Sequence, residues 1–175
     1  MKAYAVTIGF DKSTTETIQK HIDRIAKATK NDYMISNSIE PHITIGAFCA
    51  ENDQAIINIL DSEAQQLNPN TVFLKRIESF YPNVIYISPE KNNYLSTLNQ
   101  TIHDRLSDLF VVADHEYYTP QNWVPHCALA VQLNVHQYKI ALSEASKIEL
   151  PFLVTVEQIS LAECLPYRRI KTWKI

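Results

Sequence analysis

The chain has 175 residues, of which 46% are hydrophobic and 20% are charged, and its formal net charge is −3 at pH 7. This length and composition allow one core to form without disulfides or metals, so we expect a single domain over residues 1–175. The mild negative charge excludes the strongly basic surface that grips duplex nucleic acid through its phosphates. We therefore expect no duplex DNA partner, whereas a small nucleotide or an RNA end stays open.

The three cysteines, Cys49, Cys127 and Cys164, are isolated in apolar segments, as the reduced core residues of cytosolic proteins usually are. The sequence has no apolar run of membrane-spanning length, and its N-terminus does not resemble a signal peptide. It has only two glycines, Gly9 and Gly46, which excludes the glycine-rich loops that hold dinucleotides and ATP. We expect a cytoplasmic monomer that needs no cofactor and does not bind membranes.

The first half of the chain alternates between strand and helix patterns. Its first helix is predicted from a capping box at residues 13–16 (Ser-Thr-Thr-Glu), which is followed by isoleucines at helical spacing. Short β-branched runs on either side of the helices predict strands. The expected elements are a strand over residues 2–8, a helix over about 13–30, a strand over 42–48, a helix from Asn52 or Asp53 to Leu67, and a strand over 71–80.

The second half repeats this order and adds one closing strand. Its first helix is predicted from Leu95, Leu98, Ile102, Leu106 and Leu109, which recur at spacings of three and four. A connection without periodicity follows, and long connections of this kind are often functional. The expected elements are a strand over 84–88, this helix, the connection over 111–125, a strand from His126, a helix from Asn134 to Ala145, and strands over 152–165 and 168–173.

Each half contains one strand that begins with Pro-His. Residues 41–46 read Pro-His-Ile-Thr-Ile-Gly, and residues 125–130 read Pro-His-Cys-Ala-Leu-Ala. Because side chains alternate along a strand, His42 and Thr44 share one face, and Cys127 points away from His126. Two imidazoles facing one cleft suit general acid–base catalysis of displacement at phosphorus, with the Thr44 hydroxyl holding a phosphoryl oxygen.

These motifs resemble those of the two-histidine (2H) phosphoesterase superfamily, in particular bacterial proteins of the 2'-5' RNA ligase and RNA 2',3'-cyclic phosphodiesterase type. Residues 118–120 (Tyr-Thr-Pro) and 79–84 (Ser-Phe-Tyr-Pro-Asn-Val) also look like parts of that family. The resemblance implies an α+β fold with pseudo-two-fold symmetry, in which two antiparallel-rich sheets line a central cleft and helices pack outside. The lobes would span about 1–80 and 81–175, with strands free to exchange between them.

The resemblance further implies a site without metal, with His42 and His126 as catalytic residues and Thr44 as the phosphate-binding hydroxyl. The family usually has Thr or Ser two residues after the second histidine, where this chain has Ala128. Losing one hydrogen bond to a charged group should slow the reaction by about ten- to a hundred-fold. The leading hypothesis is a phosphodiesterase for cyclic or 2'-5' linked ribonucleotides. The alternatives are a weakened or inactive nucleotide-binding protein and an RNA end-joining enzyme.

Other polar and aromatic residues are weaker candidates. We interpret His21, His103, His115 and His136 as solvated surface residues, and the sequence lacks His-x-x-x-His and Cys-x-x-Cys metal motifs. The aromatic residues Tyr117, Tyr118, Trp123 and Tyr167 have either a structural role or a stacking role beside a base. Tyr118 and Arg168 are the candidate substrate contacts among these residues.

Overall fold

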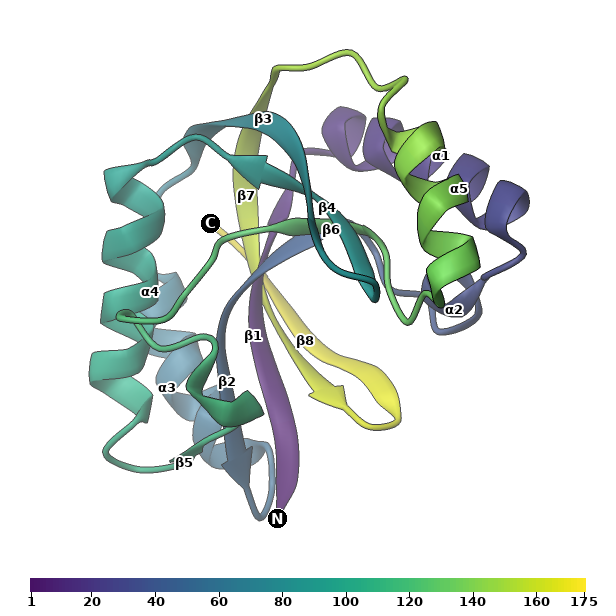
Figure 1. Cartoon of the computed structure of the whole chain (residues 1–175). Helices are drawn as coiled ribbons and strands as arrows, with labels where there is room; N and C mark the ends of the chain where they lie inside the picture. Colours follow the sequence, from purple (N-terminus) through teal and green to yellow (C-terminus); the bar gives the residue numbers. More distant parts are fainter.

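The computed structural model describes residues 1–175 apart from the side chain of residue 114 (Figure 1). Helices and strands follow the predicted alternation in both halves. In chain order they are β1 (Lys2–Phe10), α1 (Lys12–Thr29), α2 (Tyr33–Ser36), β2 (His42–Ala50), α3 (Gln54–Ala64), β3 (Asn70–Phe80), β4 (Val84–Pro89), α4 (Asn93–Leu106), β5 (Val111–Val112), the 3-10 helix η1 (Asp114–Glu116), β6 (Cys127–Ala130), α5 (Val135–Ala145), β7 (Phe152–Cys164) and β8 (Tyr167–Lys174).

The strands form one eight-stranded sheet in which every pairing is antiparallel. In the first half β1 lies between β2 and β7, and in the second half β4 lies between β6 and β3. The two arrangements correspond element by element. Along the chain, β7 is the last strand of the second half's strand–helix–strand–helix–strand order, as β3 is the last strand of the first half's. Each half thus supplies a strand to the other. The α+β class is confirmed, and the division into two lobes stays a prediction. The expected pair of sheets is wrong, because the pairing of β2 with β6 and of β3 with β7 joins all strands into one sheet.

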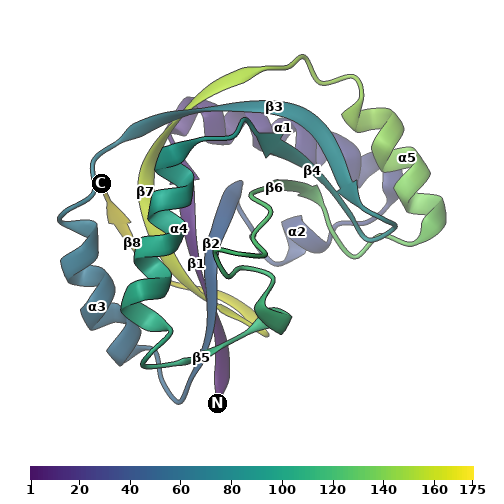
Figure 2. The same ribbon diagram turned by 60° about the vertical axis from the view of Figure 1, so that its left-hand side comes forward.

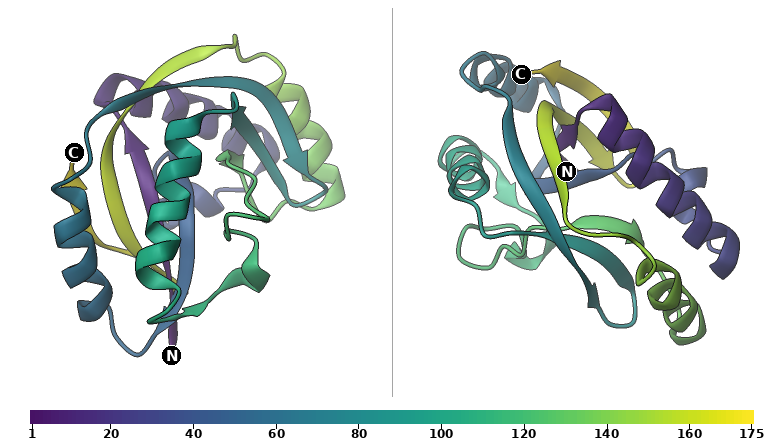
Figure 3. Two further views of the ribbon diagram at one scale, coloured as in Figure 1. Left: turned by 90° about the vertical axis from the view of Figure 1, so that its left-hand side faces the viewer. Right: turned by 90° about the horizontal axis from the view of Figure 1, so that it is seen from above.

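The helices pack in two pairs on opposite sides of the strands (Figures 1 and 2). Helix α1 contacts α5, and α3 contacts α4, so each pair also combines one helix from each half. Seen from above, the strands run between these pairs (Figure 3). The core is built from branched aliphatic side chains of both halves, among them Ile8, Ile43, Ile102 and Leu161, each with no measurable exposure.

Several details differ from the sequence prediction. Helix α1 begins after Asp11, whose carboxylate accepts the Thr14 N–H at 2.9 Å, so the predicted capping box at residue 13 is wrong. Helix α4 ends at Leu106, and Leu109 is exposed beyond it. The helix α2 was not predicted, because its four residues are too few to show a helical spacing of apolar residues.

The interpretation of His103 as a solvated residue is also wrong. Its side chain is only 4% exposed and packs against Phe48, with ring centroids 5.0 Å apart, because position 103 belongs to the buried face of α4. His21 is half-buried beside Phe152, whereas His115 and His136 are exposed as predicted. Among the described residues, no helix is long and apolar enough to cross a membrane.

Candidate active site

The two Pro-His strands pair directly with each other. Strands β2 and β6 meet through Ile43 and Cys127, and both of these side chains are fully buried in the core. The preceding residues, His42 and His126, therefore face the opposite, open side of the sheet. In this antiparallel register the two histidines are diagonal neighbours, a relation that places such residues about 7–8 Å apart. Two side chains of this length can flank one phosphate group.

Both imidazoles are held in the same way. Nδ1 of His42 lies 2.7 Å from the Glu40 carbonyl oxygen, and Nδ1 of His126 lies 2.7 Å from the Val124 carbonyl oxygen. A carbonyl only accepts hydrogen bonds, so Nδ1 carries the proton in each ring. In the neutral form each Nε2 is then an acceptor facing the open side. The backbone before each histidine thus fixes the same tautomer in both rings, and each ring can transfer a proton through Nε2.

Burial lowers the pKa of both histidines below the ordinary value of 6.5. The pKa of His42 is lowered further by the positive charges of His126 and Arg169. Glu40 acts in the opposite direction and favours the protonated form of His42, through its carbonyl oxygen and its negative charge. Burial also raises the pKa of the Cys127 thiol to about 12, so this cysteine stays protonated and is not a nucleophile.

The surroundings of His42 are polar. A narrow cavity beside it is lined by Glu40, Ser160, Tyr167 and Arg169, together with residues of β1 and β7. The Arg169 guanidinium forms an ion pair with Glu40 at 2.9 Å, which holds it at the edge of this cavity. The cavity has room for only about one water molecule, so a phosphate oxygen could meet its hydroxyls and guanidinium only from the mouth of the cavity.

The hydroxyl side chains beside His42 form a row across four strands. Thr7 of β1 pairs with Thr44 of β2 on one side and with Ser160 of β7 on the other. The Ser160 hydroxyl in turn lies 2.9 Å from the hydroxyl of Thr172 on β8. Thr44 is 9% exposed, and its hydroxyl makes no hydrogen bond to another described residue. It is available to donate to a bound oxygen.

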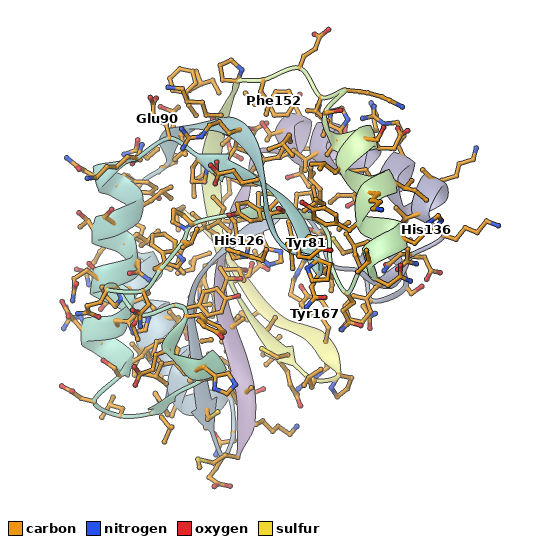
Figure 4. All side chains as sticks on the ribbon, in the orientation of Figure 1. Tyr81, Glu90, His126, His136, Phe152 and Tyr167 are labelled. Atoms are coloured by element: carbon orange, nitrogen blue, oxygen red, sulfur yellow. The ribbon has the colours of Figure 1, made fainter. Side chains whose placement is uncertain are left out.

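The surroundings of His126 are aromatic. Its ring packs against Phe80 and Tyr86 at centroid distances of 5.1 and 5.2 Å, and against Tyr118 at 6.4 Å in a stacked arrangement. These contacts border a cavity of about 530 Å³, which is also lined by Tyr81. Figure 4 shows His126 near the centre of the molecule with Tyr81 beside it, far from Glu90 and Phe152. A flat ring such as a nucleobase suits these walls.

The segment that carries Tyr118 and Trp123 is fastened to the first Pro-His strand. The Trp123 indole N–H donates to the Thr44 carbonyl oxygen at 2.9 Å. The Asn99 amide of α4 donates to the Ile45 and Tyr118 carbonyl oxygens, each at 2.8 Å. Asn99 is 1% exposed, so both bonds are shielded from water. These contacts fix the aromatic wall relative to β2.

The predicted site residues lie as follows. His42, Thr44 and His126 are on one face of paired strands, and Tyr118 lines the aromatic cavity. Arg168 forms ion pairs with Glu163 at 3.1 Å and Asp53 at 3.8 Å, and it lines neither of the two cavities described here. The neighbouring Arg169 lines the cavity of His42 instead. The sequence places these two arginines side by side after Tyr167, and the prediction selected the wrong member of the pair.

The chain is similar to known proteins in both sequence and structure. The sequence profile of the 2'-5' RNA ligase superfamily matches residues 14–165. The chain belongs to this superfamily. A Bacillus cytotoxicus protein that carries phosphoesterase as a provisional name is 29% identical over 142 residues, which cover 78% of this chain and 76% of that protein. The resemblance expected from the Pro-His motifs is confirmed.

Two solved structures share the fold of this superfamily member at low sequence identity. E. coli LigT complexed with 3'-AMP has a TM-score of 0.59 and 11% identity, and the match covers 99% of this chain and 98% of that chain. Kluyveromyces marxianus Usb1 with uridine monophosphate has a TM-score of 0.51 and 11% identity, and the match covers 99% of both chains.

Proposed function

We propose that the chain is a metal-independent phosphodiesterase that cleaves cyclic or 2'-5' linked phosphodiesters in small ribonucleotides or at RNA ends. The observation that carries this proposal is the pair of imidazoles, His42 and His126, on one face of adjoining strands with matching Nδ1 bonds. Both Nε2 atoms are then available for proton transfer at one phosphorus. Membership of the 2'-5' RNA ligase superfamily supports the same class of substrate.

In the proposed reaction His42 is the general base and His126 the general acid. His42 takes a proton from water as the new oxygen–phosphorus bond forms. His126 gives its proton to the ribose oxygen as the old phosphorus–oxygen bond breaks, so a cyclic phosphate becomes a monoester with one free hydroxyl. The assignment follows from the positive charge of Arg169, which disfavours a proton on His42. The negative substrate raises the pKa of His126 on binding and so supplies the protonated acid.

The two sides of the site divide the substrate between them. In this proposal the phosphate is held by Arg169, which lines the cavity of His42, and by Thr44, which lies opposite His126 in the pairing of β2 with β6. The base is held in the aromatic cavity beside His126, which is lined by Phe80, Tyr81 and Tyr118. Such stacking is tolerant of base identity, because every base has a flat face. The relatives that bind 3'-AMP and uridine monophosphate support a small nucleotide as the ligand.

Hydrolysis of a nucleoside 2',3'-cyclic phosphate in the presence of excess chelator tests this function. We expect turnover to a single monophosphate isomer, because one ribose oxygen is placed as the leaving group. A panel containing a 2'-5' linked and a 3'-5' linked dinucleotide then defines the linkage. Turnover that depends on added metal, or cleavage of the 3'-5' linkage alone, would contradict the proposal.

Ala128 favours a second candidate, a nucleotide-binding protein with little or no catalysis. The residue lacks the hydroxyl that the second motif of the family usually carries, although both histidines are present. Calorimetric binding of 3'-AMP without any turnover of the cyclic substrate would support this candidate. Joining of a 2',3'-cyclic phosphate end to a 5'-hydroxyl end in the same assay would instead identify the ligation direction.

A further inference from the structure

Gly9 lies between the side chains of His42 and Gln158, which are on the strands at either side of β1. In the register of β1 it pairs with His42 of β2 on one side and with Gln158 of β7 on the other. Cross-strand partners point to the same face of a sheet, so the Gln158 side chain lies on the face of His42. Only one residue position separates the two side chains, and that residue has no side chain of its own.

Gln158 occupies the space that a side chain at position 9 would need. A Cβ atom placed on Gly9 would lie 2.2 Å from Nε2 of Gln158 and 2.8 Å from its Cγ, far inside contact distance. The glutamine therefore extends across β1, from β7 toward the strand that carries His42. Glycine within a strand often marks the close approach of another group, and Gly9 is one of only two glycines in the chain.

The carboxamide of Gln158 is available to bind a ligand. It lines the cavity that contains His42, Ser160 and Arg169, and it makes no hydrogen bond to another described residue. An amide group offers two N–H donors and no charge. A neutral donor has a specific advantage here, because an additional cation beside His42 would lower the pKa of the proposed base still further.

The missing hydroxyl of the second motif would also lie beside His42, on the side away from Gln158. The pairing of Ile43 with Cys127 sets a register in which Ala128 is the residue opposite His42, just as His126 is opposite Thr44. His126 therefore has a motif hydroxyl across from it, and His42 has a methyl group. Gln158 lies on the opposite side of His42 from Ala128, two strands away on β7, and its side chain extends over Gly9 of the intervening strand β1.

We propose that the Gln158 carboxamide donates a hydrogen bond to a non-bridging oxygen of the bound phosphate and so replaces the hydroxyl lost at Ala128. Gly9 is the positioning residue that makes this reach possible. The inference rests on the proposed phosphodiesterase function and assigns a further phosphate contact to that site. It also predicts a polar phosphate side built from the first motif, β7 and β8, without a contribution from the second motif.

Substitution of Gln158 measures the contact directly. We expect Gln158→Leu to lower kcat/KM by about ten- to a hundred-fold, the range for one hydrogen bond to a charged group. Gln158→Glu should lower it further by repelling the phosphate, and should move the acidic limb of the pH profile upward, since a carboxylate raises the pKa of His42. The matched control is Gln65→Leu at the exposed end of α3, which should leave kcat/KM unchanged.

A double-mutant cycle with Gly9→Ala separates this role from a structural one. Alone, Gly9→Ala should displace the glutamine and reproduce the loss seen for Gln158→Leu. Combined with Gln158→Ala, it should cost nothing further, because the added methyl group enters space that the glutamine has vacated. Thermal unfolding of each variant verifies that it folds. Additive losses, or full activity of Gln158→Leu, would overturn the inference.

Calorimetric binding of 3'-AMP distinguishes this inference from the proposed function. If the natural chain turns over no cyclic substrate but Gln158→Leu weakens 3'-AMP binding by ten-fold or more, the phosphate contact stands and the catalytic assignment falls. If the chain is active and neither turnover nor 3'-AMP binding changes in Gln158→Leu, the contact is wrong and the catalytic assignment stands.

Discussion

The two histidines are prepared alike by the backbone but stand in different chemical surroundings. Each donates from Nδ1 to the carbonyl oxygen two residues earlier, at the same distance of 2.7 Å. Around His42 lie hydroxyls, a guanidinium and a carboxamide. Around His126 lie the rings of Phe80, Tyr86 and Tyr118. A repeated motif thus has a polar side and an aromatic side, which the proposed function assigns to the phosphate and to the base.

This difference explains why the loss of a motif hydroxyl at Ala128 need not end catalysis. In a symmetric site each hydroxyl would face the histidine of the other motif. Here Thr44 still faces His126, while the position facing His42 has a methyl group and an aromatic neighbour, since Ala128 pairs with the buried Tyr86. In the proposed site, the polar groups of β7 and β8 make the phosphate contacts on this side.

The largest expected effect comes from removing either histidine. Proton transfer is the one function that both sides of the proposed site share, and it requires both imidazoles. His42→Ala and His126→Ala should each lower kcat by about 100- to 10,000-fold, the range for a positioned acid or base. The double variant should be little worse than either single one, because the two groups act on one step. Single-turnover rates with a 2',3'-cyclic nucleotide provide the measurement. Undiminished turnover in either variant would contradict both assignments.

The next effect separates the base side from the phosphate side. Tyr118→Leu should raise KM by about five- to a hundred-fold, because stacking on an aromatic side chain contributes about 1–3 kcal/mol per base. The matched comparison is Tyr33→Leu on the short helix α2, which lies outside both cavities. Initial rates are measured over a range of substrate concentrations. A fall in kcat at constant KM would mean that Tyr118 serves proton transfer instead.

Much of this organisation could be predicted from local sequence patterns. The alternation of strands and helices, the two Pro-His strands and the inward direction of Cys127 all follow from periodicity within short windows. The aromatic wall could not be predicted in the same way, since Phe80 and Tyr86 reach His126 only through the pairing of β3, β4 and β6. Gln158 depends on an even longer connection. Gly9 was the available signal, but it directly follows the predicted strand over residues 2–8. Only the longer strand β1 (Lys2–Phe10) makes it a glycine within a strand, where it indicates close approach.

A hydroxyl restored at position 128 tests whether the two sides compensate for each other. Ala128→Thr should raise kcat/KM by up to about ten-fold in a Gln158→Leu background, since it returns one hydrogen bond to the phosphate. In the natural chain the gain should be smaller, because Gln158 already makes that contact. Thermal unfolding is measured alongside, since the new side chain adjoins Tyr86. Equal gains in both backgrounds would mean that the two residues bind different oxygens.

The smallest effect concerns the pH at which kcat/KM is highest, and not the size of kcat/KM at that pH. Because the pKa values of His42 and His126 both lie below 6.5, the maximum of kcat/KM should fall on the acidic side of that value. Activity declines at low pH as the base His42 gains a proton, and at high pH as the acid His126 loses one. Removing the charge in Arg169→Leu raises the pKa of His42, so the acidic limb should move to higher pH while the alkaline limb stays in place. The matched control Arg105→Leu on α4, where the arginine pairs with Glu63, should move neither limb. If the alkaline limb moves instead, the roles of base and acid are exchanged, and the polar side of the site protonates the leaving group.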